Sequence, residues 1–144
     1  TKALKVRQTP DNRFETHIGR DDVEHIVDSR GVILASGRFI GGGLFADRTH
    51  IRETIFSLPV FQPDSRHDWH HRDFLDARGH SINQAGLEID DTFRPLNDSG
   101  KPAFETLFAA GSILAHNDWK RMKCGAGLAI TTAFGAVNSF MRIN

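Results

Sequence analysis

The feature that most constrains the fold is a short apolar run, ended by a glycine, that precedes a long helical pattern. The two stretches are Thr106–Ala115 (TLFAAGSILA) and Cys124–Ala136 (CGAGLAITTAFGA). Leu107–Ala110 predicts a buried strand, and apolar residues at spacings of three and four predict a helix from Cys124 to the end. Glycines let a ligand approach the backbone, and free N–H groups at a helix start attract anions. The pattern favours one wall of a nucleotide-cofactor site, with a plain strand-to-helix connection as the alternative.

A second stretch has the same design. Val32–Gly37 (VILASG) is apolar and ends in small residues, which is typical of a strand buried on both faces. Open α/β sheets bind ligands beyond the carboxyl ends of their strands, so both strand ends are candidates for one site. Three glycines, Gly41–Gly43, follow shortly after and are equally consistent with a flexible loop.

The amino-terminal part predicts a small antiparallel β-meander. Polar and apolar residues alternate in three stretches, and turn-forming residues separate these stretches. We expect strands at Ala3–Gln8, Arg13–Ile18 and Val23–Val27, with turns at Pro10–Asn12, Gly19–Asp22 and Asp28–Gly31.

Composition excludes several classes of protein. Lys plus Arg and Asp plus Glu number 18 each among 144 residues, so no field for nucleic acid is implied. No apolar run approaches the ~20 residues that a membrane span needs. Cys124 is the only cysteine, which rules out an internal disulfide and favours a reducing, cytoplasmic setting. Because the chain opens with Thr1 and leads almost directly into a strand, we expect it to be part of a longer protein.

The middle of the chain concentrates charge. Arg48, His50, Arg52 and Glu53 lie within six positions, and a pair of guanidinium groups beside a histidine suits a small anionic substrate. A solvated charged loop is the alternative.

A histidine-rich segment follows. His67, His70 and His71 lie close to Asp68 and Asp73, but their spacing matches no strict zinc or metalloprotease motif. We therefore expect no metal site, and a metal-dependent hydrolase is the weakest of the functional hypotheses.

The motifs together resemble the carboxy-terminal part of the flavin-dependent dehydrogenases, and most closely the B-subunit family of anaerobic glycerol-3-phosphate dehydrogenase. The resemblance spans nearly the whole chain in the right order. The stretches that carry it are Val32–Leu44, Ile51–Glu53, Thr92–Pro95, Leu107–Leu114 and Cys124–Gly127.

The resemblance implies a mixed α/β fold in which the β-meander joins the returning strands and final helix of a split Rossmann-like FAD-binding domain. Residues 1–37 would supply the meander and returning strand, and residues 104–144 the last strand and helix. Residues 38–103 would be an irregular substrate-side or interface region. The Gly-x-Gly-x-x-Gly turn that opens such domains is absent from this sequence.

The resemblance also implies which residues bind the cofactor, FAD or FMN: Ala35, Ser36, Gly37, Gly111, Ser112, Gly125, Ala126, Gly127 and Leu128. The amides of Gly125–Leu128 would contact the isoalloxazine edge. Related flavoproteins commonly carry an acidic residue where this chain has Ser112, so that contact must be weaker or rearranged. The catalytic candidates are Arg52, Arg48, His50 and Glu53, with Arg52 the best candidate for an anion contact.

The implied activity is oxidation of glycerol 3-phosphate to dihydroxyacetone phosphate, or relay of its electrons toward quinone. The implied partners are a flavin-containing A subunit and an iron–sulfur membrane subunit. The chain would then be cytoplasmic, or peripheral on the inner face of the membrane through a partner. A non-catalytic, flavoprotein-like scaffold that docks a catalytic subunit is the alternative. Since the pyrophosphate-binding turn is absent from it, we expect the chain alone to bind flavin weakly.

Overall fold

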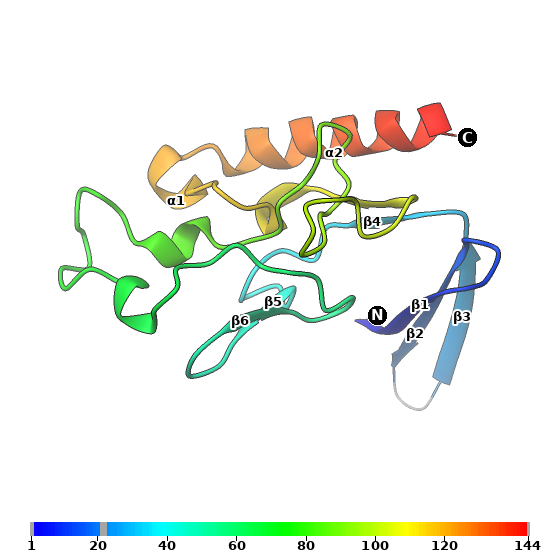
Figure 1. Ribbon diagram of the computed structural model, residues 1–144, viewed down its shortest axis with the longest axis horizontal. Coiled ribbons are helices and arrows are strands. Elements are labelled where there is room, and N and C mark those ends of the chain that lie inside the picture. Colours follow the sequence, from blue (N-terminus) through cyan, green and yellow to red (C-terminus); the bar gives the residue numbers. More distant parts are fainter. Residues whose placement is uncertain (1, 21–22, 144) are drawn as a thin grey trace.

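A β-meander occupies one end of the molecule. The computed structural model describes residues 2–20 and 23–143 (Figure 1). Strands β1 (Lys2–Gln8), β2 (Phe14–Arg20) and β3 (Val23–Ser29) form an antiparallel sheet in that order, as expected. The turn predicted at 19–22 is wrong in its first half, because Gly19 and Arg20 continue β2 and pair with β3. Positions 21 and 22 lie outside the described residues.

The two apolar stretches pair with each other. Strand β4 (Val32–Leu34) runs parallel to β7 (Leu107–Ala109), with Val32 opposite Leu107. The Val32 amide donates to the Thr106 carbonyl at 3.0 Å, and the Ala110 amide donates to the Leu34 carbonyl at 3.1 Å. This pair is the parallel element expected of a Rossmann-like domain, and it confirms the predicted mixed α/β fold.

β4 is shorter and less buried than the sequence predicts. The strand ends at Leu34, and the side chain of Ile33 is 38% exposed. Residues 35–37 leave the sheet, because Gly37 turns the backbone with φ +70°. Among the described residues β7 is the strand that pairs with β4, so the other edge of β4 is unpaired and Ile33 stays partly exposed. β7, by contrast, is buried along its whole length, as predicted.

Helix α2 (Gly125–Ile143) lies along the sheet formed by β4 and β7 (Figure 1). It begins one residue after the predicted start, and Thr132 and Ala136 are buried beneath it. Phe140 packs edge-on against Phe108, with ring centroids 6.1 Å apart. The side of α2 away from the sheet is exposed. The large apolar residues on that side are Ile130, Phe134, Val137 and Met141.

Short elements and loops make up the middle of the chain. Strands β5 (Leu44–Ala46) and β6 (Ile51–Glu53) form a hairpin, and single 3₁₀ turns occur at η1 (Arg66–Asp68) and η2 (Ser81–Gln84). After β7 come η3 (Gly111–Ile113) and the one-turn helix α1 (Trp119–Met122). The periodicity of the sequence does not signal any of these 3₁₀ turns or α1, because each is too short to show a repeat.

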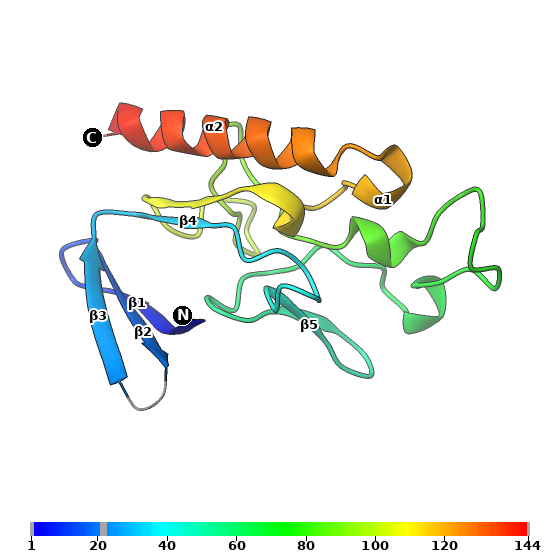
Figure 2. The same ribbon diagram turned by 180° about the vertical axis from the view of Figure 1, so that it is seen from behind.

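An aromatic cluster joins the meander to the middle of the chain. Phe14 is fully buried, and its ring centroid lies 5.9 Å from that of Phe56 and 5.8 Å from that of Phe104. Both contacts have the edge-to-face geometry that aromatic rings favour. Seen from behind, the meander lies below β4, at the end of the molecule where α2 ends (Figure 2).

Candidate functional site

The ends of β4 and β7 lie side by side. Gly37 and Gly111 both have positive φ, +70° and +77°, which only glycine adopts without strain. A Cβ atom added to Gly37 would lie 3.6 Å from the hydroxyl oxygen of Ser112, whereas one added to Gly111 would meet nothing within 4 Å. The structure therefore brings the predicted pairs Ser36–Gly37 and Gly111–Ser112 together, with open space beside Gly111.

The start of α2 is linked to the same turn. The Gly111 amide donates to Thr132 Oγ1 at 2.8 Å, and this hydroxyl donates to the Leu128 carbonyl at 2.5 Å. The first helical hydrogen bond of α2 runs from the Leu128 amide to the Cys124 carbonyl at 2.8 Å. The amides of residues 125–127 precede this bond, so they have no acceptor within the helix. Within the described part of the chain they donate to no other backbone group, so they are available donors at the positive end of the helix dipole.

These residues fit a ligand that has both acceptor groups and a flat surface. A Cβ added at Gly127 would meet nothing within 4 Å, so the backbone there is open to close approach. The hydroxyl of Ser36 is buried and has no hydrogen-bond partner among the described residues. Ala35, the remaining predicted residue at the end of β4, is exposed. We refer to Ala35–Gly37, Gly111–Ser112 and Gly125–Leu128 as the cofactor wall.

A buried arginine next to the cofactor wall escaped the sequence analysis. The guanidinium group of Arg38 donates to three backbone carbonyls: that of Asn83, that of Leu114 at 2.8 Å and that of Asn117 at 3.0 Å. Burial lowers the pKa of Arg38, and the nearby Asp118 partly counters this effect. Arg38 holds the loop after β4 against two later segments. Its acceptors are backbone oxygens, which leave no signal in a sequence.

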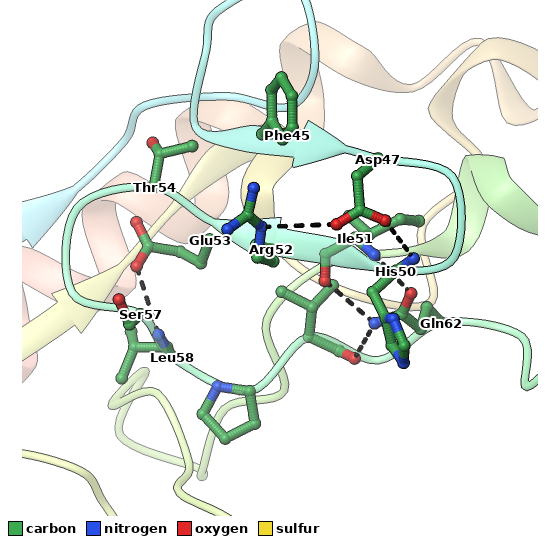
Figure 3. Close-up of a pocket in the computed structure, with 12 residues that line it drawn as sticks. Phe45, Asp47, His50, Ile51, Arg52, Glu53, Thr54, Ser57, Leu58 and Gln62 are labelled. Carbon is green, nitrogen blue, oxygen red and sulfur yellow. Dashed lines mark hydrogen bonds and ion pairs between the residues drawn. The ribbon is translucent and has the colours of Figure 1, made fainter.

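Three of the four catalytic candidates line one cavity of about 730 Å³ (Figure 3). His50, Arg52 and Glu53 come from the β5–β6 hairpin, and the segment 57–62 closes the opposite side. The Arg52 guanidinium carbon lies 5.3 Å from the ring centroid of Phe45, and its Nε lies 3.9 Å from a carboxylate oxygen of Asp47. Arg52 is still largely exposed and keeps donors available to a ligand.

The two carboxylates of this cavity are engaged by backbone amides. Glu53 is 3% exposed and accepts from the amides of Ile55 at 2.8 Å and Phe56 at 2.7 Å. Asp47 accepts from the amides of Thr49 and His50, each at 2.8 Å, and these bonds lower its pKa from 3.8 to about 2. The catalytic role of Glu53 stays a prediction, but its carboxylate already holds the loop that follows β6.

Arg48, the fourth candidate, lies apart from the other three. It lines a second cavity of about 530 Å³ together with Arg66, Trp69 and His70. His70 and His71 each lie near His80, with ring centroids 5.3 and 6.2 Å away. Within residues 2–20 and 23–143, no group of three or more His, Cys, Asp or Glu side chains is arranged to hold a metal ion.

Comparison with known proteins gives the class. The profile of the FAD binding domain family matches residues 7–128, which is most of the chain, so the chain belongs to this family. The expected flavoprotein superfamily is thereby confirmed.

Individual relatives agree with the closer resemblance, and each is the B subunit of an anaerobic glycerol-3-phosphate dehydrogenase. The chain is 34% identical over 104 residues to the probable B subunit of Halobacterium salinarum, covering 72% of this chain and 24% of that protein. It is 31% identical over 115 residues to the B subunit of Vibrio cholerae, with coverages of 80% and 26%. The B subunit of Yersinia pestis is 32% identical over 123 residues, with coverages of 85% and 28%.

The chain thus spans about a quarter of the length of the curated relatives that it matches. No solved structure matches it. Among the described residues, no helix has both the length and the apolar character needed to cross a membrane.

Proposed function

We propose that this chain forms one side of the FAD site of a flavin-dependent dehydrogenase subunit, with FAD rather than FMN as the cofactor. The observation that carries the proposal is the meeting of two strand ends with the free amides of a helix start. Gly37 and Gly111 turn the chain at the ends of β4 and β7, and the bond between Gly111 and Thr132 ties the second turn to α2.

Each part of the cofactor wall would have a separate task. A bound flavin supplies reversible acceptance of two electrons from a substrate. The amides of Gly125–Gly127 would stabilise negative charge on the ring edge, since they are unpaired within the helix and lie at its positive end. Ser36 and Ser112 would donate hydroxyl hydrogen bonds to the polar chain of the cofactor. Gly111 would let that chain approach the backbone.

The proposal for the substrate and partners is supported by the relatives, which are named as glycerol-3-phosphate dehydrogenase subunits. We infer that the whole protein oxidises glycerol 3-phosphate or passes on its electrons, together with a flavin-containing A subunit and an iron–sulfur membrane subunit. Arg52, exposed in the cavity of Figure 3, is the group that would contact the phosphate. The protein would lie on the cytoplasmic side and reach the membrane through a partner.

A chimera tests the proposal. The chain is to replace the matching 24% of the Halobacterium salinarum relative, and the purified product is to be examined for visible flavin absorption and for the flavin released on denaturation. A yellow product that releases FAD supports the proposal. A folded, colourless product would instead support the scaffold alternative, in which the fold is kept and the cofactor is lost.

Two aspartate variants of the chimera locate the site. Gly127→Asp places a carboxylate beside the free amides of α2, where it stabilises the helix but repels a reduced flavin. We expect the affinity for reduced FAD to fall by about fivefold or more, because ~1 kcal/mol corresponds to that factor. Thr131→Asp puts the same charge one turn further along α2, on an exposed residue, and serves as the control. Equal losses in both variants would contradict the placement of the ring edge at the helix start.

A further inference from the structure

From the arrangement of charge around the hairpin, we infer that the cavity lined by Arg48, Arg66, Trp69 and His70 is a binding site for a small phosphate- or carboxylate-bearing organic anion. We call it the Arg48 cavity. It is separate from the cavity of Figure 3, although Asp47 lines both. None of its residues belongs to the cofactor wall, so the inference is independent of flavin binding.

The Arg48 cavity has a built floor and a basic rim. Its apolar lining is Ala46, Trp69 and Ile82, and the Ile82 amide donates to the Trp69 carbonyl at 3.2 Å. Arg66 stacks on the indole, with its guanidinium carbon 5.3 Å from the ring centroid, and donates to the Asp47 carbonyl at 3.1 Å. This bond fixes the η1 segment against the hairpin and leaves most Arg66 donors unused.

The two cavities differ in their balance of positive and negative side chains. The Arg48 cavity presents two arginines against one carboxylate, whereas the cavity of Figure 3 presents one arginine against two. The carboxylate shared by both, that of Asp47, is engaged by the amides of Thr49 and His50. Positive charge exceeds negative charge in the Arg48 cavity, and this excess attracts an anion there.

Trp69 adds a second sign of an absent ligand. Its side chain is 4% exposed, and its indole N–H is buried without an acceptor among the described residues. Buried N–H groups in proteins nearly always have a partner. Because Trp69 also lines the Arg48 cavity, an oxygen of an anion seated there is a candidate acceptor for this donor.

The chain contains two tryptophans and no tyrosine, which makes a direct assay available. In the Trp119→Phe background, Trp69 is the only tryptophan and reports on its cavity. We expect inorganic phosphate, titrated at constant ionic strength against chloride, to change its fluorescence in a saturable way. Arg48→Gln and Arg66→Gln should each weaken phosphate binding by about tenfold, the usual loss for one charge-assisted hydrogen bond.

Two matched controls decide the outcome. Arg72→Gln removes an exposed arginine from the same segment that lines neither cavity, and it should leave phosphate binding unchanged. Arg52→Gln removes the arginine of the other cavity and should also have little effect. The inference is overturned if phosphate gives no saturable change, or if Arg52→Gln weakens binding while Arg48→Gln and Arg66→Gln do not. The Arg48 side chain is exposed, so the Arg48→Gln variant should fold. It therefore tests the inference even if Arg66→Gln fails to fold.

Discussion

The same substitution, glycine to alanine, should change the free energy of unfolding in opposite directions at two positions of α2. Replacing glycine by alanine inside a helix stabilises the helix by about 1 kcal/mol, because alanine loses less backbone freedom on folding. At Gly127 a Cβ meets nothing within 4 Å, so Gly127→Ala should raise the free energy of unfolding by about 0.5–1 kcal/mol. Gly127 lies in the first turn of α2, where this stabilisation is smallest, so we expect a value near the lower end of that range.

At Gly135 the same Cβ would overlap the ring of Phe93, whose Cδ2 atom would be 3.1 Å away and whose Cε2 and Cζ atoms would be nearer. Phe93 cannot easily withdraw. Its backbone has φ +67°, its amide donates to the Asp90 carbonyl at 3.0 Å, and its carbonyl accepts from the Ala109 amide at 2.8 Å. Overpacking of this kind costs about 1–3 kcal/mol. Set against the helix gain, Gly135→Ala should therefore lower the free energy of unfolding by about 1 kcal/mol.

Urea unfolding followed by far-ultraviolet circular dichroism measures both variants on one scale. The variants should differ by about 1–3 kcal/mol, and Phe93→Leu combined with Gly135→Ala should recover part of the loss as a coupling energy. If Gly135→Ala stabilises the protein as much as Gly127→Ala does, the Phe93 contact is not rigid and the reasoning is refuted.

Three further substitutions test the loops around the site. Arg38→Met leaves three backbone carbonyls without their donor and should lower the free energy of unfolding by about 3 kcal/mol or more, whereas a loss below about 1 kcal/mol in a urea titration would contradict the clamp. Glu53→Gln should destabilise the protein by about 1–3 kcal/mol by weakening the bonds to the loop after β6. Lost turnover in the chimera with unchanged stability would instead favour a catalytic Glu53. For Asp47, whose pKa is lowered from 3.8 to about 2, the stabilisation is complete above the unfolded value and disappears as pH falls through the folded one. The urea midpoints of the wild type and Asp47→Asn should accordingly differ at pH 5 and converge near pH 2, and a constant difference would refute the assignment.

The parts of the fold that could be predicted from the sequence are those with a strong local pattern. The meander follows from a repeat of two, β7 from a continuous apolar run, and helix α2 from spacings of three and four. The shared design of β4 and β7 assigns their ends to one site, and the parallel pair brings those ends together. Periodicity cannot tell which other segment of the chain packs against an apolar residue. Periodicity shows that Ile130 and Phe134 are apolar. It does not show that both side chains stay exposed, uncovered by the other described parts of this chain.

For the site, as for the fold, the sequence predicts some features and not others. Glycines at strand ends and at a helix start are visible in a sequence, because their backbone roles restrict the residue type. The grouping of side chains is not visible. Arg48 and Arg52 are four positions apart, yet they line different cavities, because Arg48 lies in the turn between β5 and β6 whereas Arg52 lies in β6 itself. Arg66 and Trp69 join Arg48 only through contacts between segments that are distant in sequence.

The β4–β7 pair also governs the order of events in folding. Val32 pairs with Leu107, so the two strand ends of the cofactor wall come together only when the loop of residues 33–106 has closed. Closing a loop of that length costs about 4 kcal/mol of chain entropy, and this loss precedes any gain from the contact. A ligand held by both strand ends would bind only the closed form and would shift the equilibrium toward it. A bound cofactor would then stabilise the closed form of this loop. In the apoprotein, the amide hydrogens of β4 and β7 should exchange first when hydrogen exchange is followed residue by residue.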